Sequence, residues 1–327
     1  MVIDSDSDFF KLACAVPLQN ATTPSLQKAG VELLVRRDDQ IDCSLSGNKA
    51  YKLFYNLRAA RDAGFYQLLS FGGAYSNHLH ALALAGDKFE FKTIGVVRGE
   101  RPRVLSATLQ DAVAAGMQLI FIGRDDYERK AFGVLMDEWR SKFGDFYLIP
   151  EGGAGQLGAK GMSLLGHALE HQLKGDYTSV CIACGTGTSL AGLAAGIAAA
   201  GQSEKSVIGF SVLKGDGDLG TGIAETYRQL RASKYLLQSH GQVPAANWRL
   251  ISGFHAGGYG KKHPPYLFDF WRSFEQTTGV PLDPVYTLKL MWGIHWLAEQ
   301  GYWSRGSRII AIHSGGLQGR RGFICPE

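Results

Sequence analysis

Two segments place reactive side chains at the start of predicted helices. SGNKAYKL at 46–53 puts Lys49 in the first helical turn, with Lys52 one turn later. A lysine on a helix is usually solvated, but a buried one has a lowered pKa and can form a Schiff base. FGGAYSNH at 71–78 brings Ser76 and Asn77 to the next helix N-terminus. These residues predict either an ordinary N-cap or a cradle for a carboxylate, built from backbone N–H groups and a hydroxyl.

A third segment predicts a phosphate site. CGTGTS at 184–189 follows the buried strand VCIAC and opens an alanine-rich helix. Its glycines allow close approach to the backbone, its hydroxyls can donate, and the helix N-terminus favours an anion. It is not a Walker loop, because no Lys-Ser/Thr follows the last glycine, and a dinucleotide fingerprint fits poorly because position 190 is Leu. A purely structural turn is the alternative.

The elements that must position these segments alternate along the chain. Apolar runs such as LIFIG and IIAIH lack alternation, which is typical of strands buried on both faces of a parallel sheet. The sequence therefore predicts an α/β fold of open parallel sheets with helices on both faces, and ligands at the carboxyl ends of the strands. We expect strands at 31–37, 67–71, 92–98, 118–123, 146–150, 179–184, 206–212, 248–253 and 308–313. Helices are expected near 49–63, 77–87, 104–115, 126–142, 158–173, 188–200, 218–237, 265–278 and 286–300.

Composition narrows the class of protein. The 327 residues are 45% hydrophobic and 20% charged, enough for a packed core, and 42 glycines against 10 prolines suit many tight turns. A net charge of +4 and short, isolated basic runs do not favour nucleic acid. No apolar stretch is long enough for a membrane span. Five cysteines form no disulfide framework, so we expect a cytoplasmic protein.

Two later turns complete an ordered set of motifs. GGYGKKHP at 257–264 and LDPVYTLK at 282–289 carry Tyr259 and Tyr286. In order, SGNK, GGxxSNH, the glycine/threonine loop, GYG, DPVY and HSGG resemble the pyridoxal-phosphate enzymes of the aminocyclopropane-carboxylate deaminase and D-cysteine desulfhydrase group. The resemblance spans about residues 32–316 and implies the tryptophan-synthase-β-like fold. A larger domain would comprise 1–54 and 153–327, a smaller one 55–152, with the cofactor in the cleft between them. The resemblance also implies a homodimer.

The resemblance implies a role for each matching residue. Lys49 would hold pyridoxal 5'-phosphate covalently and later take the Cα proton. Ser76, with the backbone of Asn77 and His78, would hold the carboxylate of a small amino-acid substrate, with Tyr75 beside it. The cofactor would contact Asn77 through its ring hydroxyl, Gly185, Thr186, Gly187, Thr188 and Ser189 through its phosphate, and Thr287 or Ser314 through its ring nitrogen. Tyr259 and Tyr286 would sit over the reacting carbons.

The residue after Tyr286 separates two reactions within the group. Ring-opening deamination of the cyclopropane amino acid goes with a glutamate there, which can keep the ring nitrogen protonated, whereas this chain has Thr287. A neutral hydroxyl suits loss of a good leaving group from Cβ. We therefore expect a lyase that performs α,β-elimination, giving pyruvate, ammonia and a leaving group such as sulfide, with ring-opening deamination as the alternative. The chain departs from the family pattern at Tyr51, Tyr75, Leu288 and Lys261–His263.

Other functions need separate tests. HALEH at 167–171 matches an inverted zinc-peptidase motif, in which His167 and His171 share a helix face beside Glu170 and only Glu225 is at hand as a further ligand. An amphipathic helix explains the same pattern, and the cofactor interpretation needs no metal. Cys181 and Cys184 should point to opposite faces of a strand. A non-catalytic binder on the same fold is a further alternative, for which Lys49 would be dispensable.

Overall fold

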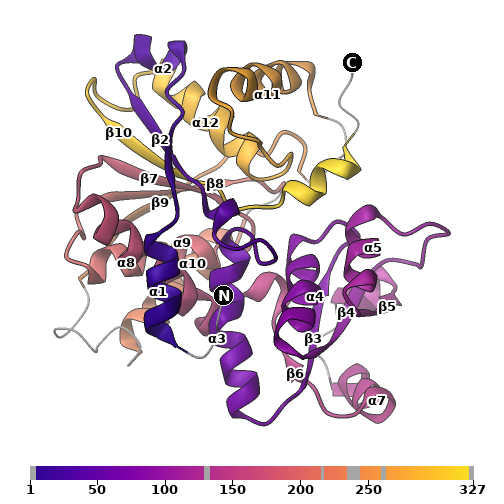
Figure 1. Ribbon diagram of the computed structural model, residues 1–327. Helices are drawn as coiled ribbons and strands as arrows, with labels where there is room; N and C mark the ends of the chain where they lie inside the picture. The colour runs from indigo at the N-terminus through magenta and orange to yellow at the C-terminus, as the bar shows by residue number, and fades with distance from the viewer. Residues whose placement is uncertain (1–4, 129–132, 215–216, 234–243, 259–262, 324–327) are drawn as a thin grey trace.

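The strands form two separate sheets (Figure 1). The computed structural model describes residues 5–128, 133–214, 217–233, 244–258 and 263–323. One sheet has six strands in the order β1-β2-β10-β7-β8-β9, and the other has four in the order β5-β4-β3-β6. The strands are β1 (Leu18–Asn20), β2 (Glu32–Arg36), β3 (Gln67–Gly72), β4 (Lys92–Arg98), β5 (Gln118–Ile122), β6 (Tyr147–Leu148), β7 (Ser179–Cys184), β8 (Ser206–Ser211), β9 (Asn247–Ile251) and β10 (Arg308–Ile312).

The predicted parallel sheets are confirmed, with one exception at an edge. Every predicted strand is present, and all pairings are parallel except that of β1 with β2. β1 was not predicted, because its three residues, Leu-Gln-Asn, carry no β-branched or alternating pattern. The short helices α1 (Asp6–Cys14) and α2 (Pro24–Ala29) were also missed.

Helices cover both faces of the six-stranded sheet. On one face Val180 and Ile182 pack against α1, α3 (Asn48–Asp62), α8 (Gln156–Leu173), α9 (Thr188–Ala199) and α10 (Leu219–Ala232). On the other, Cys181 and Ala183 pack against α2, α11 (Pro265–Thr278) and α12 (Thr287–Glu299). Because neighbouring strand residues face opposite ways, Cys181 and Cys184 lie in different cores, as predicted.

The four-stranded sheet is covered in the same way. Leu68 and Val97 pack toward α4 (Asn77–Phe89) and α5 (Ala107–Ala114). On its other face Phe71 and Val96 pack against α6 (Arg124–Glu128) and α7 (Gly133–Phe143). We call this sheet with these four helices the small unit, and the six-stranded sheet with its helices the large unit. The predicted domain boundary at 54/55 falls inside α3, which continues across it.

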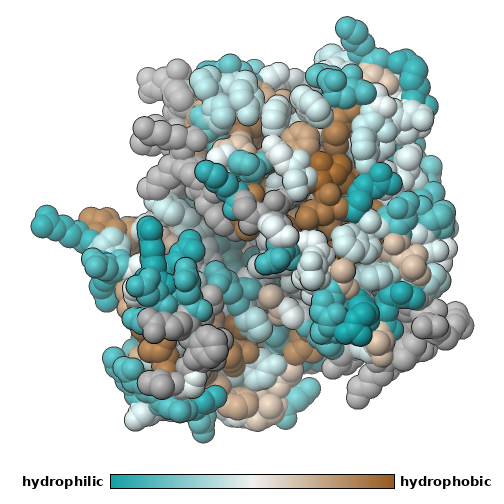
Figure 2. Space-filling view, turned by 180° about the vertical axis from the view of Figure 1, so that it is seen from behind, coloured by the Kyte–Doolittle hydropathy of each residue, from teal (hydrophilic) through white to brown (hydrophobic). Residues whose placement is uncertain are grey.

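Polar residues prevail on the face of the molecule that is seen from behind (Figure 2). Seen from behind, the molecule is mostly hydrophilic, and brown residues gather mainly in one group at the upper right (Figure 2). Within the described residues, no helix has both the length and the apolar character needed to cross a membrane.

Helices α8 and α9 pack backbone against backbone. A Cβ added at Gly192 would collide with the carbonyl oxygen of Ala159, and one at Gly196 with that of Ser163. These contacts allow no side chain, so they hold α9, which follows the predicted phosphate loop, close to α8.

We expect Gly196→Ala to lower the free energy of unfolding by about 1–3 kcal/mol, since backbone atoms must shift to admit the methyl group. Gly222→Ala is the matched control on exposed α10, where an added Cβ meets nothing within 4 Å. That change should raise stability by about 0.5–1 kcal/mol. Urea unfolding followed by circular dichroism measures both, and equal effects would contradict this account of the packing.

Candidate active site

A cavity of about 450 Å³ lies between the two units. Its walls come from the start of α3, the turns after β3 and β7, the turn before α12 and the C-terminal segment. The predicted site residues that line it are Lys49, Tyr75, Ser76, Asn77, His78, Gly185, Thr186, Gly187, Ser189 and Tyr286. Thr188, Thr287 and Ser314 are buried near these turns but do not line it. Tyr259 lies outside the described residues.

Lys49 presents its amine to the cavity from the first turn of α3. The helix begins after Gly47, whose φ of 70° and close approach to the Ser314 carbonyl both require glycine. Burial lowers the pKa of Lys49 to about 8, and the nearby Asp283 charge only partly opposes this. No described residue accepts a hydrogen bond from its amine. A partly neutral, unengaged amine is what a nucleophilic lysine needs.

Lys52 lies in the same wall but is engaged. Its side chain is buried, and its Nζ donates to the carbonyl oxygen of Gly152 at 3.3 Å. Burial and the neighbouring Lys49 hold the pKa of Lys52 well below its ordinary value. The sequence placed both lysines on one helix turn, and the structure distinguishes them by this hydrogen bond.

The N-terminus of α9 is open to an anion. Gly187 precedes it with φ of 77°, and no side chain caps the first turn, which holds no acidic residue. A Cβ at Gly187 would collide with Ile223. The free N–H groups and the helix dipole therefore favour a negative ligand here. Ser189 Oγ lies 3.0 Å from Asn48 Nδ2, and the Thr186 and Thr188 hydroxyls lie 3.3 Å apart.

The N-terminus of α4 offers a second such site. Ser76 caps it, with its Oγ accepting from the Leu79 N–H at 3.2 Å. The N–H groups of Asn77 and His78, in the first turn, have no acceptor within the helix. The predicted N-cap is thus confirmed, and the geometry leaves two N–H donors for a carboxylate.

The His78 imidazole is turned into the protein. Ser70 Oγ donates to the Ile149 carbonyl at 2.7 Å and lies 2.8 Å from His78 Nε2, so Nε2 carries the proton. Nδ1 is buried with no partner among the described residues. Burial, with the charges of Lys49 and Lys52, holds the pKa of His78 well below its ordinary value. His78 is a neutral residue of the cavity wall.

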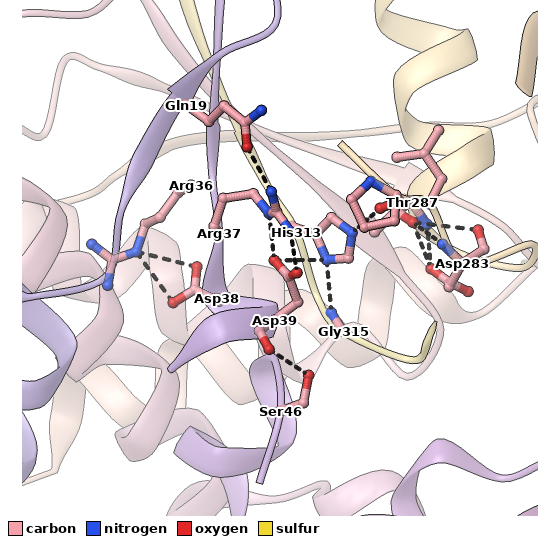
Figure 3. Close-up of polar contacts among 12 residues, drawn as sticks. Gln19, Arg36, Arg37, Asp38, Asp39, Ser46, Asp283, Thr287, His313 and Gly315 are labelled. Atoms are coloured by element: carbon pink, nitrogen blue, oxygen red, sulfur yellow. Dashed lines mark hydrogen bonds and ion pairs between the residues drawn. The ribbon is translucent and has the colours of Figure 1, made fainter. Parts of the chain in front are cut away.

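Asp283 fixes the start of α12 and was not predicted. Its buried carboxylate accepts from the N–H groups of Val285, Tyr286 and Thr287 at 2.9, 3.0 and 2.7 Å. The Thr287 hydroxyl donates to the same carboxylate at 2.8 Å (Figure 3). Asp-Pro before a predicted helix was the available signal, because aspartate is a favoured cap. The Thr287 hydroxyl therefore serves Asp283.

A buried histidine joins the loops around the cavity. His313 Nε2 donates to the Pro281 carbonyl at 2.6 Å, and Nδ1 accepts from the Gly315 N–H at 3.3 Å. Asp39 lies 3.4 Å from Nδ1 and is held by Arg37 in a fork of 2.8 and 2.6 Å (Figure 3). Ser314, next in the chain, accepts at its carbonyl from the Asn48 N–H at 3.3 Å. The backbone of Ser314, whose hydroxyl is predicted to contact the ring nitrogen of the cofactor, is thus held in place by hydrogen bonds.

The residues that depart from the family pattern lie in different parts of the structure, some in the core and one at the cavity. Tyr51 is buried, and its hydroxyl donates to Asp38 at 2.7 Å. Leu288 is part of the core between the large sheet and α12. His263 stacks on Phe323 at 5.1 Å between ring centroids, while 261 and 262 lie outside the described residues. Among the described departures, only Tyr75 lines the cavity.

The zinc alternative finds no support in the geometry. Glu170 is buried and accepts a hydrogen bond from Tyr177, while exposed His171 contacts the edge of Phe10. The part of the chain that the structure describes holds no group of three or more metal-ligating side chains, so His167, His171 and Glu225 form no such site.

Known proteins match this chain over nearly its whole length. The family model for pyridoxal-phosphate dependent enzymes matches residues 14–315. This chain belongs to that family. The bifunctional D-cysteine desulfhydrase/1-aminocyclopropane-1-carboxylate deaminase of Arabidopsis thaliana is 28% identical in an alignment of 330 positions that covers 96% of this chain and 79% of that protein. The 1-aminocyclopropane-1-carboxylate deaminase of Rhizobium rhizogenes is 28% identical in an alignment of 311 positions that covers 90% of this chain and 89% of that protein.

A solved structure agrees. The crystal structure of an ACC deaminase homologue is 26% identical, covers 96% of each chain and has a TM-score of 0.79. The resemblance to the deaminase and desulfhydrase group, the fold and the dependence on pyridoxal phosphate are thereby confirmed. The predicted enzyme class, a pyridoxal-phosphate-dependent lyase, is consistent with both names.

The cavity suits this cofactor. The uncapped N-terminus of α9 can take the phosphate, and the Lys49 amine can take the aldehyde. Of the two lysines, Lys49 is the one without a hydrogen-bond acceptor among the described residues.

We expect Lys49→Ala to abolish covalent capture of the cofactor, while Lys52→Ala retains it. Borohydride reduction followed by peptide mass spectrometry measures the modified residue. Capture on Lys52 in the parent protein would contradict the assignment.

The lowered pKa predicts how fast the cofactor attaches. The neutral amine is the nucleophile, so the rate of attachment to cofactor-free protein should rise about tenfold per pH unit below pH 8 and level off above it. With a lysine of ordinary pKa, the rate of attachment would keep rising up to about pH 10.5. The growth of the visible absorption band after mixing gives the rate. The same measurement with Nα-acetyl-lysine, which keeps a free side-chain amine, corrects for protonation changes of the cofactor itself.

Proposed function

We propose that this protein catalyses α,β-elimination on a small amino acid, giving pyruvate, ammonia and a leaving group such as sulfide. The activity would resemble that named for the desulfhydrase relative. The observation that carries the proposal is the arrangement at the start of α12. Position 287 is a threonine, and the nearby Asp283 carboxylate is occupied by three N–H groups and one hydroxyl.

This arrangement bears on how strongly the cofactor withdraws electrons. The bound cofactor supplies an electron sink for the bond that breaks at Cα. A carboxylate at position 287 could hold a proton on the ring nitrogen, but the threonine hydroxyl cannot, and Asp283 already has four donors. We propose that the Ser314 hydroxyl, which is buried beside the cavity, is the neutral partner of the ring nitrogen. A weaker sink is sufficient when the Cβ substituent is a good leaving group.

The chain's own residues would perform the remaining steps. Lys49, whose amine is partly neutral at pH 8, would take the Cα proton. Ser76 and the first-turn N–H groups of α4 would hold the substrate carboxylate, with Tyr75 beside it. Asn77 would position the cofactor ring, and residues 185–189 its phosphate. Tyr286, and Tyr259 beyond the described residues, would border the reacting carbons.

Ring-opening deamination is the second candidate, since both curated relatives carry that name. The two reactions give different oxo acids from different substrates, so one assay separates them.

We expect the loaded protein to release pyruvate, ammonia and sulfide in equal amounts from one enantiomer of cysteine. Release of 2-oxobutanoate from 1-aminocyclopropane-1-carboxylate should be slower by about tenfold or more, because the weaker sink must support ring opening. Coupled assays with lactate dehydrogenase and sulfide detection measure the products, and Lys49→Ala is the inactive control. A faster deamination would reverse the assignment.

We also propose that the protein works as a homodimer in the cytoplasm. The resemblance supports the dimer. The four cysteines that the structure describes are all free, which suits a reducing compartment.

A further inference from the structure

The C-terminal segment lies with a glycine face against the turn after β3. Leu317–Gly322 forms a 3₁₀ helix, η3, with three residues per turn, so Gly316, Gly319 and Gly322 fall on one side. An added Cβ at Gly316 would collide with the Asn77 amide, and one at Gly322 with the ring of Tyr75. At Gly319 the nearest atom, Asn77 Oδ1, would be 3.8 Å away.

Side chains of the segment add to this contact. Gln318 Nε2 donates to Asn77 Oδ1 at 2.7 Å. Tyr75, Asn77, Gly322 and Phe323 all line the cavity. The backbone of the segment is therefore the surface against which Tyr75 and Asn77 rest, and no side chain of residues 319 or 322 stands between them.

Two adjacent arginines fasten the segment to different units. Arg320 forks onto Glu275 of α11, in the large unit, at 2.6 and 3.1 Å. Arg321 forks onto Asp111 of α5, in the small unit, with one arm at 3.2 Å. Asp111 also lies 3.2 Å from His80 Nε2 on α4, the helix that follows Tyr75. Arg321 thus links the segment to the helix pair that carries the substrate turn.

We infer that Tyr75 limits the size of the substrate side chain, and that Gly322 and the Arg321–Asp111 pair set the position of its ring. This inference rests on the proposed function. Tyr75 is the described family departure that faces the cavity, and the ring is held from behind by backbone, which is stiffer than a side chain. Arg321 and Gly322 are positioning residues, since they act through Tyr75.

The test measures binding without turnover. The protein loaded with pyridoxal phosphate is titrated with alanine and leucine, each as both enantiomers, and the change in its visible spectrum gives a dissociation constant for each of the four ligands. The constants of leucine and alanine are then compared within the enantiomer that binds more tightly. Neither amino acid carries a leaving group on Cβ. The ratio of the leucine constant to the alanine constant measures how well the pocket accepts a larger substrate side chain. Partial unfolding weakens the binding of both amino acids and so leaves the ratio unchanged.

Tyr75→Ala should improve leucine binding relative to alanine by about fivefold or more, as expected for space gained in a pocket. Gly322→Ala should change the ratio by about threefold, because the methyl group must displace the ring. In the Tyr75→Ala background the same glycine change should have no effect on the ratio. Gly319→Ala is the matched control for a methyl group on the same cavity-lining face of η3 that displaces no side chain, since its nearest atom, Asn77 Oδ1, would be 3.8 Å away.

The Arg321–Asp111 ion pair is tested separately, with the neighbouring Arg320 as the control. Arg321→Gln should change the ratio by up to about threefold, in keeping with a partly exposed pair. About 0.5 M sodium chloride should reproduce the change in the parent protein by screening. Arg320→Gln removes the same charge but leaves the link to the small unit, so the ratio should stay at the parent value.

The outcomes separate this inference from the proposed function. A protein that shows no visible band with pyridoxal phosphate overturns both. A normal band with a ratio unchanged by Tyr75→Ala overturns the inference alone. A Gly322→Ala effect that persists without the Tyr75 ring, or equal effects of Arg320→Gln and Arg321→Gln, overturns the roles given to Gly322 and Arg321.

Discussion

The site depends on one buried imidazole. His313 has no exposed surface, and its two nitrogens hold the loop before α12 through Pro281 and its own loop through Gly315. Asp39, from the segment that leads to Lys49, lies beside Nδ1, and its carboxylate is paired with the Arg37 guanidinium. In a low-dielectric interior each of these groups would be costly unpaired. Meeting that requirement brings three segments, distant in sequence, to the edge of one cavity.

The second constraint is electrostatic. Lysine amines and two helix N-termini face the same enclosed space, and no acidic residue lies in the first turn of α4 or α9. Leaving N–H groups of α9 without a side-chain cap lowers the stability of the empty protein. A phosphate and a carboxylate would each remove part of that cost. The two helix N-termini therefore suit the cavity to a pair of anionic groups, one at α9 and one at α4.

Local patterns were enough to predict most of the fold. Apolar runs marked the strands of both sheets, and the glycine-rich turns after β3 and β7 contain the lining residues Ser76 and Thr186. The SGNK motif marked Lys49 at the start of α3. Contacts made across the fold were not predictable in this way. β1 exists because β2 lies beside it, Thr287 is turned to Asp283 by the geometry of the α12 start, and Tyr51 is withdrawn into the core by Arg36 and Asp38. Each depends on a partner that spacing alone does not specify.

The order of strands also bears on how the chain is made. β2 lies between β1 and β10, and Glu32 pairs with Arg308, 276 residues later. During synthesis the small unit can close its own sheet once β6 has emerged, whereas β2 must wait for almost the entire chain. At about 5–20 residues per second that wait lasts roughly 15–60 seconds. For that time the apolar side chains of β2 lack their neighbour on one side, so the six-stranded sheet is among the last parts of the fold that the growing chain can complete.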